Sequence, residues 1–252
     1  MNPVIVRNVK IGEGIPKICV PVVGVTAEEI RKEAEALLSI PADLVEWRAD
    51  WYEGVFDVAK VKEVLRNLRC VLGEKPILVT FRTSGEGGEK SITEADYLAL
   101  NREVAESGLA DLIDAELFMG DRLVKELIET AHQNGVKVIA SNHDFQKTPE
   151  KEEIVSRLRK MQELGADILK IAVMPQEKKD VLTLLAATEE MIRLFAKQPV
   201  ITMSMAEMGV ISRIAGEAFG SAVTFGSAKK SSAPGQLPAG ELSKVLKVLH
   251  RA

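Results

Sequence analysis

The sequence predicts an α/β protein that folds as a single (β/α)8 barrel, or TIM barrel, over residues 1–252. Short apolar segments alternate with helix-patterned segments along the chain, as in proteins with a parallel sheet. The alternation repeats eight times. No Gly-x-Gly-x-x-Gly motif follows the first apolar segment, which disfavours the main alternative, an open doubly wound sheet.

Residues 1–15 precede the first repeat and do not fit it. The segment PVIVRNVKIGEG has the pattern of a small β-hairpin, which we expect to cover the bottom of the barrel. The strands of the repeats are predicted from short apolar runs rich in β-branched residues. In chain order these strands cover residues 17–23, 43–50, 76–82, 110–117, 136–144, 166–174, 199–205 and 221–226.

The helices are predicted from helical spacing of apolar residues and from start and stop signals. Thr26 with Glu29 has the spacing of a capping box, and a later helix opens at Thr93 and closes at Gly108. In chain order the expected helices cover residues 26–39, 57–73, 93–108, 121–135, 148–165, 178–197, 209–219 and 239–252.

The composition is that of an ordinary globular protein, 46% hydrophobic and 28% charged, with a net charge of −4. No basic stripe is present, so we expect no nucleic-acid partner. No apolar run approaches the ~20 residues of a membrane helix, and the N-terminus lacks a signal-peptide pattern, so a cytoplasmic location is expected. Cys19 and Cys70 are too few for a disulfide framework and are expected to be small buried side chains. The three histidines show no metal-ligand spacing.

Barrel active sites lie at the carboxyl ends of the strands, where side chains alternate between the interior and the helix layer. Glu46 and Arg48 share one strand face, and Trp47 on the other face needs a dry, helix-facing site. The same alternation sends Thr80 and Arg82 inward. We therefore expect these polar side chains to converge in the upper interior.

Lys170 stands in the middle of the apolar strand segment GADILKIAVMP. A lysine is rarely fully buried in such a strand without a compensating partner. Alternation alone does not say which face of the strand is inward, but helices pack over the outer face, so Lys170 and His143 are expected inside. A buried, neutral amine can attack a ketone to form an imine, and a histidine can move the protons.

The loops after the strands add further polar groups. Arg213 follows the seventh strand, TSGEGGEKS (83–91) carries Glu86, and the Gly/Ser/Pro-rich segment 226–240 has the composition of a mobile lid. Asp114 and Glu116 are candidates to line the barrel floor and balance Lys170. Each of these polar residues, taken alone, has a structural explanation as part of a buried ion pair or as a loop residue. A purely structural account requires all of these explanations to hold at once, which favours a functional site.

These motifs together resemble the type I 3-dehydroquinate dehydratase family. The resemblance runs through EWRAD (46–50), TFRTSGEGGE (80–89), SNHDFQKTP (141–149), DILKIAVMP (167–175), TMSMAEMGVISRIAGEAFGSAVTFG (202–226) and SAPGQ (232–236). The ordered set covers nearly the whole chain and is far more specific than any one motif.

The resemblance implies dehydration of 3-dehydroquinate to 3-dehydroshikimate in the shikimate pathway of aromatic amino acid biosynthesis. Lys170 would form a Schiff base with the substrate ketone, His143 would act as general acid and base, and Glu86 would orient and tune His143. Arg213 would bind the ring carboxylate. The other substrate-binding residues implied are Glu46, Arg48, Arg82, Met203, Phe225, Ser232 and Gln236.

The resemblance also implies a homodimer that needs neither cofactor nor metal. One position departs from the family pattern: Pro21 stands where some members carry a substrate-binding serine, and proline offers neither hydroxyl nor N–H.

Three other functions stay open at this point. A class I aldolase acting on a sugar phosphate would also use a lysine imine, and GSAKKSSAPGQ could serve as its phosphate cradle. A non-catalytic carboxylate-binding barrel would need the arginines but neither Lys170 nor His143. A metal-dependent barrel using His143, Asp144 and Glu46 has too few ligands to be favoured.

Overall fold

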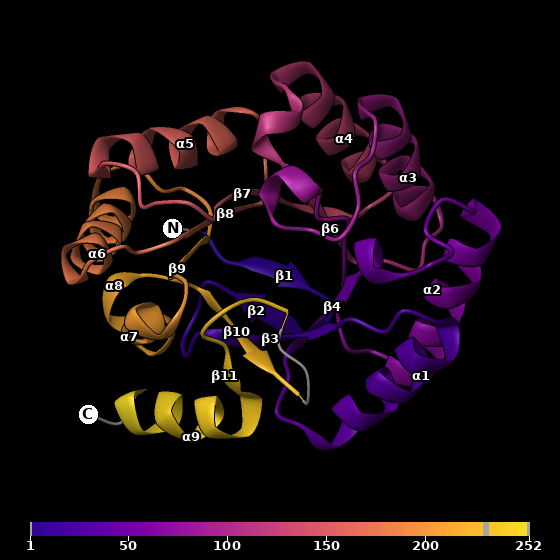
Figure 1. The fold of residues 1–252 in the computed structure, drawn as a ribbon, viewed down its shortest axis with the longest axis horizontal. Helices are drawn as coiled ribbons and strands as arrows, with labels where there is room; N and C mark the ends of the chain where they lie inside the picture. The colour runs from indigo at the N-terminus through magenta and orange to yellow at the C-terminus, as the bar shows by residue number, and fades with distance from the viewer. Residues whose placement is uncertain (1, 229–231, 251–252) are drawn as a thin grey trace.

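The computed structural model describes residues 2–228 and 232–250. Eight parallel strands pair side by side in chain order and curl into a barrel, with helices around the outside (Figure 1). The fold class predicted from the sequence is confirmed. The barrel strands are β3 (Lys17–Val22), β4 (Leu44–Arg48), β5 (Ile77–Thr80), β6 (Leu112–Glu116), β7 (Lys137–Asp144), β8 (Ile168–Val173), β9 (Val200–Ser204) and β10 (Val223–Ser227).

The barrel closes between β9 and β10 through the residues that precede β10. Val200 bridges to Ser221 in parallel, and the amide of Ala222 donates to the carbonyl of Val200 at 2.8 Å. The Ser221 hydroxyl also accepts from the amide of Thr202 at 3.0 Å. A further short strand, β11 (Leu237–Pro238), pairs with the end of β10.

The helices pack against the outer face of the strands. The Thr26 capping box predicted at the start of α1 is present, with Thr26 Oγ1 accepting from the Glu29 amide at 3.2 Å. The helices are α1 (Ala27–Ala36), α2 (Val58–Leu72), α3 (Glu94–Glu106), α4 (Asp121–Gln133), α5 (Lys151–Glu163), α6 (Lys178–Leu194), α7 (Val210–Ile214), α8 (Gly216–Phe219) and α9 (Ala239–His250).

The expected N-terminal hairpin is also present. It consists of β1 (Val4–Val6) and β2 (Val9–Ile11), which pair antiparallel. Val6 and Ile11 are buried in the interior cluster, and Arg7 pairs with Asp111 at 2.6 Å near the start of β6. The hairpin therefore closes the end of the barrel opposite the carboxyl ends of the strands.

The core has two parts, separated by the sheet. The larger part lies between strands and helices and contains Trp47 and Phe81, as the alternation along β4 and β5 predicts. The smaller part fills the barrel interior with residues such as Leu78, Ile168 and Phe225. Polar side chains from the same inward face lie above this apolar interior and form the site.

Other predicted elements differ by a few residues at their ends, and two segments differ in kind from the expectation. The region 209–219 is not one helix: a 3-10 turn, η5 (Glu207–Gly209), leads into α7, and α8 begins anew at Gly216. The backbone of Gly216 packs so closely on the carbonyl of Ser221 that a Cβ there would lie 2.7 Å from it. The expected strand 43–50 ends at Arg48 and turns into a 3-10 segment, η2 (Ala49–Trp51).

The expectation that both cysteines are buried is half right. Cys19 is buried in the barrel interior, whereas Cys70 on α2 is exposed. Within the described ranges, no helix is long and apolar enough to cross a membrane. Residues 229–231 of the expected lid, and 1, 251 and 252 at the ends of the expected domain, lie outside the described residues.

Candidate active site

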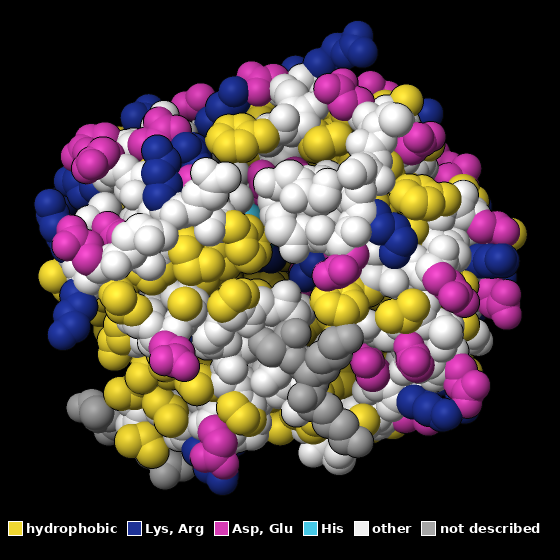
Figure 2. All heavy atoms as spheres, in the orientation of Figure 1, with side chains coloured by type: hydrophobic (Ala, Val, Ile, Leu, Met, Phe, Trp, Pro, Cys, Tyr) yellow, Lys and Arg dark blue, Asp and Glu magenta, His cyan; other side chains and the backbone are white. Residues whose placement is uncertain are grey.

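A cavity opens at the carboxyl ends of the strands, with about 450 Å³ of space including its mouth. Figure 2 shows it as a hollow near the middle of the face, with basic side chains and a histidine at its bottom. Ten of the residues predicted for the site line it: Glu46, Arg48, Arg82, Glu86, His143, Lys170, Met203, Phe225, Ser232 and Gln236. The other lining residues are Gly87, Phe145, Ala172, Met205 and Ala233.

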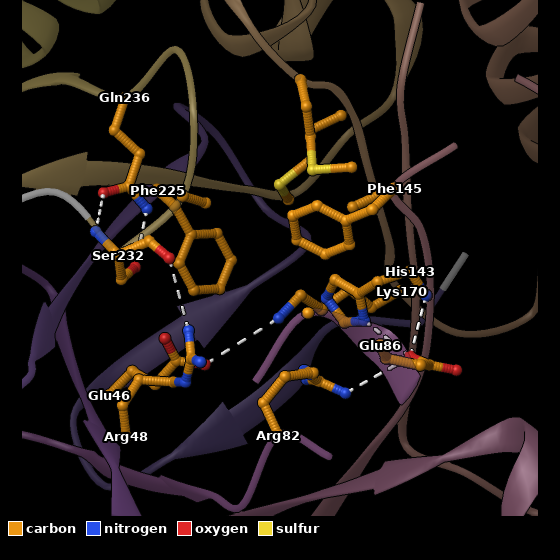
Figure 3. A pocket seen from close by; sticks show the side chains of 15 residues that line it. Glu46, Arg48, Arg82, Glu86, His143, Phe145, Lys170, Phe225, Ser232 and Gln236 are labelled. Carbon is orange, nitrogen blue, oxygen red and sulfur yellow. Dashed lines mark hydrogen bonds and ion pairs between the residues drawn. The ribbon is translucent and has the colours of Figure 1, made fainter. Parts of the chain in front are cut away.

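Lys170 lies at the bottom of this cavity on β8 and is 4% exposed. Its amino group lies 3.9 Å from Glu46 Oε1 and 4.4 Å from the centre of the Phe225 ring (Figure 3). It also lies 3.8 Å from Asp114 Oδ2. The expectation that Asp114 balances Lys170 is confirmed. Glu116 contacts Arg82 instead, at 2.8 Å. Lys170 is thus buried, but two acidic side chains lie within 4 Å of its amino group.

His143 and Glu86 are brought together from two separate elements. His143 is on β7, and Glu86 ends a 3-10 turn, η3 (Ser84–Glu86), in the loop after β5. Glu86 Oε2 lies 2.9 Å from both the Nδ1 atom and the backbone nitrogen of His143. When Glu86 is ionised, it accepts the proton on Nδ1 and leaves Nε2 free to accept another.

The surroundings shift the pKa values of both groups. Burial raises the pKa of Glu86 to about 8, against the opposing effect of the Arg82 charge. Burial also lowers the pKa of His143 well below its usual value, and the charges of Arg82, Lys170 and Arg48 lower it further. His143 is therefore held neutral near neutral pH, the form that a general base requires.

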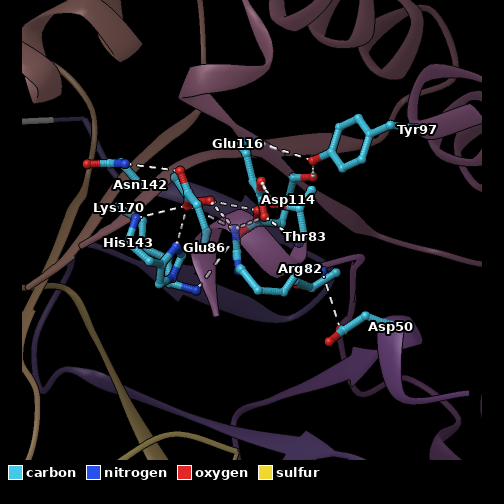
Figure 4. A network of polar contacts seen from close by, with 12 residues as sticks. Asp50, Arg82, Thr83, Glu86, Tyr97, Asp114, Glu116, Asn142, His143 and Lys170 are labelled. Carbon is cyan, nitrogen blue, oxygen red and sulfur yellow. Dashed lines mark hydrogen bonds and ion pairs between the residues drawn. The ribbon is translucent and has the colours of Figure 1, made fainter. Parts of the chain in front are cut away.

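Arg82 is the centre of a buried ionic network (Figure 4). Its guanidinium pairs with Asp114 at 2.9 Å, Glu116 at 2.8 Å and Glu86 at 3.5 Å. It also donates to the Ser141 hydroxyl at 3.0 Å. Burying a charge is costly unless it is paired, and this network provides the Arg82 guanidinium with three acidic partners.

Asp50 is a functional neighbour that the sequence reasoning missed. Both of its oxygens accept from Arg48 at 2.8 Å, and they also accept from the amides of Arg82 at 3.3 Å and Glu89 at 3.1 Å. The side chain is fully buried. In the sequence, Asp50 stands two positions after the inward Arg48 in EWRAD, and this spacing could have indicated the ion pair.

Phe145 and Gly87 were also missed. The Phe145 ring covers Gly87, where a Cβ would lie 2.4 Å from the ring, and Gly87 has a φ of +82°. This close packing sets the wall of the cavity between the 83–91 loop and the end of β7. Ring packing of this kind leaves no signal in one sequence.

Ser232 and Gln236 belong to the segment that covers the cavity. Gln236 Nε2 donates to Ser232 Oγ at 3.0 Å, and Gln236 Oε1 accepts from the Ser232 amide at 3.1 Å. The Ser232 carbonyl lies 3.5 Å from an Arg48 nitrogen. The two residues thus lie over the site, as expected of this segment.

Arg213, on α7, does not line the cavity but lies directly behind Met203. One of its nitrogens donates to the carbonyl of Pro234 at 2.8 Å, and another lies 3.8 Å from Met203 Sδ. Burial lowers the pKa of Arg213 to about 10, and within residues 2–228 and 232–250 no acidic side chain compensates it. A buried cation without a counter-ion is a place for an anionic ligand.

No group of three or more histidine, cysteine, aspartate or glutamate side chains arranged to hold a metal ion occurs within residues 2–228 and 232–250. The arrangement instead provides an amine, a neutral imidazole with a carboxylate partner, and buried arginines. The fold and this site define a (β/α)8 barrel with a buried lysine and a histidine at the carboxyl ends of its strands.

Comparison with known proteins identifies the family of barrels to which this chain belongs. The family model for type I 3-dehydroquinase matches residues 18–252. A relative from Clostridium botulinum (strain Eklund 17B / Type B), named 3-dehydroquinate dehydratase, is 61% identical over 245 residues, which cover 97% of this chain and 96% of the relative. The chain belongs to the type I 3-dehydroquinase family.

Solved structures agree with this membership. The crystal structure of type I 3-dehydroquinate dehydratase from Clostridium difficile, with covalently modified comenic acid, is similar with a TM-score of 0.97 and 57% identity, covering 100% of this chain and 99% of that one. The enzyme from Aquifex aeolicus VF5 is similar with a TM-score of 0.78 and 30% identity, covering 94% and 100%.

Proposed function

We propose that this protein dehydrates 3-dehydroquinate to 3-dehydroshikimate in the shikimate pathway, through a Schiff base on Lys170. The observation that carries the proposal is the convergence of Lys170 and the His143–Glu86 pair at one cavity, with the uncompensated Arg213 directly behind its wall at Met203. Such a site suits a substrate with a ketone for the amine of Lys170, an acidic C–H beside it for His143, and a ring carboxylate for Arg213.

The chemistry follows from the positions of the groups. The Lys170 amine attacks the ketone carbon, and loss of water gives a protonated imine. His143 removes a proton from the adjacent carbon, and the electrons move into the imine to give an enamine. The enamine expels the hydroxyl group, which takes the proton from His143 and leaves as water. Hydrolysis of the imine frees the product and the amine, so one water is lost overall.

The buried carboxylates have roles in this scheme too. Glu46 and Asp114 lie within 4 Å of the Lys170 amino group and stabilise the positive charge of the iminium. Arg48, Arg82 and the Ser232–Gln236 segment bind the ring hydroxyls, and Met203 and Phe225 form the apolar walls. Arg213 exchanges the Pro234 carbonyl for the ring carboxylate.

Borohydride reduction with 3-dehydroquinate, followed by peptide mass mapping, tests the proposal. We expect a reduced adduct on Lys170, and none on a Lys170→Ala variant. Turnover by Lys170→Ala at a near-normal rate would refute the imine mechanism. If the folded protein gave no adduct with fresh substrate, a sugar phosphate would be tried next, because a class I aldolase uses the same lysine chemistry.

We also propose that the protein works as a homodimer in the cytoplasm. Exposed apolar side chains on the adjacent helices α7 and α9, including Ile211, Val248 and Leu249, are one candidate surface. Both cysteines are free, as is usual in a reducing compartment. Sedimentation equilibrium tests the dimer: a monomer at all concentrations would overturn it.

A further inference from the structure

The His143–Glu86 pair rests on a second set of contacts that reaches the outer helix layer. Glu86 uses its two oxygens differently: Oε2 lies against His143, whereas Oε1 accepts from Asn142 Nδ2 at 3.0 Å (Figure 4). Asn142 is 1% exposed and lies next to His143 on β7. Two neighbouring residues of β7 thus contact the two oxygens of the Glu86 side chain.

The Asn142 amide is held in one orientation by Arg157 of α5. A guanidinium nitrogen of Arg157 donates to Asn142 Oδ1 at 2.8 Å. Guanidinium groups only donate hydrogen bonds, and an ionised carboxylate only accepts them. An amide placed between Arg157 and Glu86 must therefore turn its oxygen to the arginine and its NH2 group to the carboxylate.

Arg157 is itself fixed before any ligand arrives. It pairs with Glu153 one turn earlier on α5 at 2.7 Å, and its guanidinium lies 5.1 Å from the centre of the Phe118 ring. Its side chain is 16% exposed, so it bridges the surface and the buried amide. A side chain already held by two contacts loses little freedom when it orients a third group.

We propose that Arg157 and Asn142 form a positioning relay that holds Glu86 in the orientation in which it supports His143. This inference rests on the proposed function, because it assigns the relay to the proton-transfer step. Neither residue touches the cavity, so both act through Glu86 and neither is a catalytic residue.

The relay makes a prediction that a purely structural contact does not. The Asn142 amide donates to the ionised form of Glu86, and this contact lowers the pKa of that carboxyl against the effect of burial. Loss of the donor raises the Glu86 pKa. The activity that depends on ionised Glu86 then appears only at higher pH.

The experiment compares Arg157→Met with Arg159→Met. Arg159 lies two residues further along α5, stacks on Phe195 in the same way and makes no contact with the site. Methionine keeps most of the side-chain length over the ring and removes the donors. For each variant, kcat and KM with 3-dehydroquinate are measured across pH, together with borohydride trapping on Lys170.

Arg157→Met should lower kcat by about tenfold, less than the ~100-fold or more expected for loss of a general acid/base. KM and imine trapping should change little, and the acidic limb of the kcat profile should move to higher pH. Arg157→Lys, which retains a donor, should restore part of the rate. Asn142→Ala should repeat the effect, and Arg159→Met should match the unsubstituted protein.

Two results would overturn the relay. One is an Arg157→Met protein with the kcat and pH profile of Arg159→Met. The other is a lower kcat with an unmoved pH profile and no recovery in Arg157→Lys, which would leave a structural contact only. Failure of the proposed function looks different, because then the unsubstituted protein shows neither turnover nor an adduct.

Discussion

At the scale of single residues, the site contrasts paired and unpaired cations. Arg82 and Arg48 are each bound by carboxylates, so their charges are compensated before any ligand binds. Arg213 has only a carbonyl and a thioether as its polar neighbours among the described residues. The difference separates arginines whose charge is compensated within the fold from one whose charge only an anionic ligand would compensate.

Arg213→Ala should raise KM for 3-dehydroquinate by about 10- to 100-fold, the range of a charge-assisted hydrogen bond. The fall in kcat should be smaller, because the reacting atoms lie elsewhere in the ring. Steady-state kinetics measure both. Arg193→Ala, at an exposed position paired with Glu189, is the control. An unchanged KM would remove Arg213 from carboxylate binding.

Asp50→Asn tests the pairing that sequence reasoning missed. Asparagine has the same shape but leaves the Arg48 charge buried and poorly compensated, a change that typically costs about 3–5 kcal/mol. Urea unfolding should show a loss of this order, together with lower kcat, because Asp50 also anchors the loop that carries Glu86. A loss below about 1 kcal/mol would mean that the pair is not a stabilising one.

At the scale of elements, the site depends on loops held tightly to strand ends. The 83–91 loop brings Glu86 to His143 through turns that glycines permit. At Gly88 a Cβ would lie 1.9 Å from the carbonyl oxygen of Arg82, and at Gly87 the ring of Phe145 leaves no room. Gly87 is therefore required by contact and by conformation, and Gly88 by contact.

Gly87→Ala should reduce both stability and kcat. The φ of +82° costs an L side chain about 1–3 kcal/mol, and the clash with Phe145 adds to this and displaces Glu86. Thermal unfolding and kinetics measure the two effects. The matched control is Gly85→Ala in the same loop, where the nearest atom to the new Cβ is at 3.6 Å. Equal behaviour of the two variants would contradict this account.

At the scale of the whole molecule, the burial of Glu86 and His143 couples the site to stability. The pKa of Glu86 is raised to about 8, so the folded state retains a proton that the unfolded state loses above the ordinary pKa of 4.5. This contribution to stability is present below pH 4.5 and is lost as the pH rises toward 8. His143, with a lowered pKa, contributes in the opposite sense: its share is lost as the pH falls below 6.5.

Glu86→Gln removes the first of these contributions. Between pH 4.5 and 8 the free energy of unfolding should therefore fall less steeply with pH in Glu86→Gln than in the unsubstituted protein. Urea unfolding at several pH values across this window measures the slopes. Parallel curves would show that Glu86 is ionised in the folded state throughout the window.

The sequence by itself determined the barrel, the hairpin below it and most of the site. Alternating apolar patterns specify strands and helices, and the period of two along a strand groups the side chains that share a face. The need to keep polar groups out of the helix layer then places Glu46, Arg82 and Lys170 inside. The ordered motifs also carried the family resemblance, which the comparisons confirmed. These are local properties, and they can be read along the chain.

Only the tertiary structure decided which side chains pair. Asp50, Asn142 and Arg157 acquire their roles from residues on other elements, and the Phe145 ring meets Gly87 across two loops. The tertiary structure also placed Arg213 behind Met203, outside the cavity wall. Pairing energies depend on distance and burial, which are set mostly by packing between segments far apart in sequence, so local patterns such as the Arg48–Asp50 spacing indicate few of the pairs.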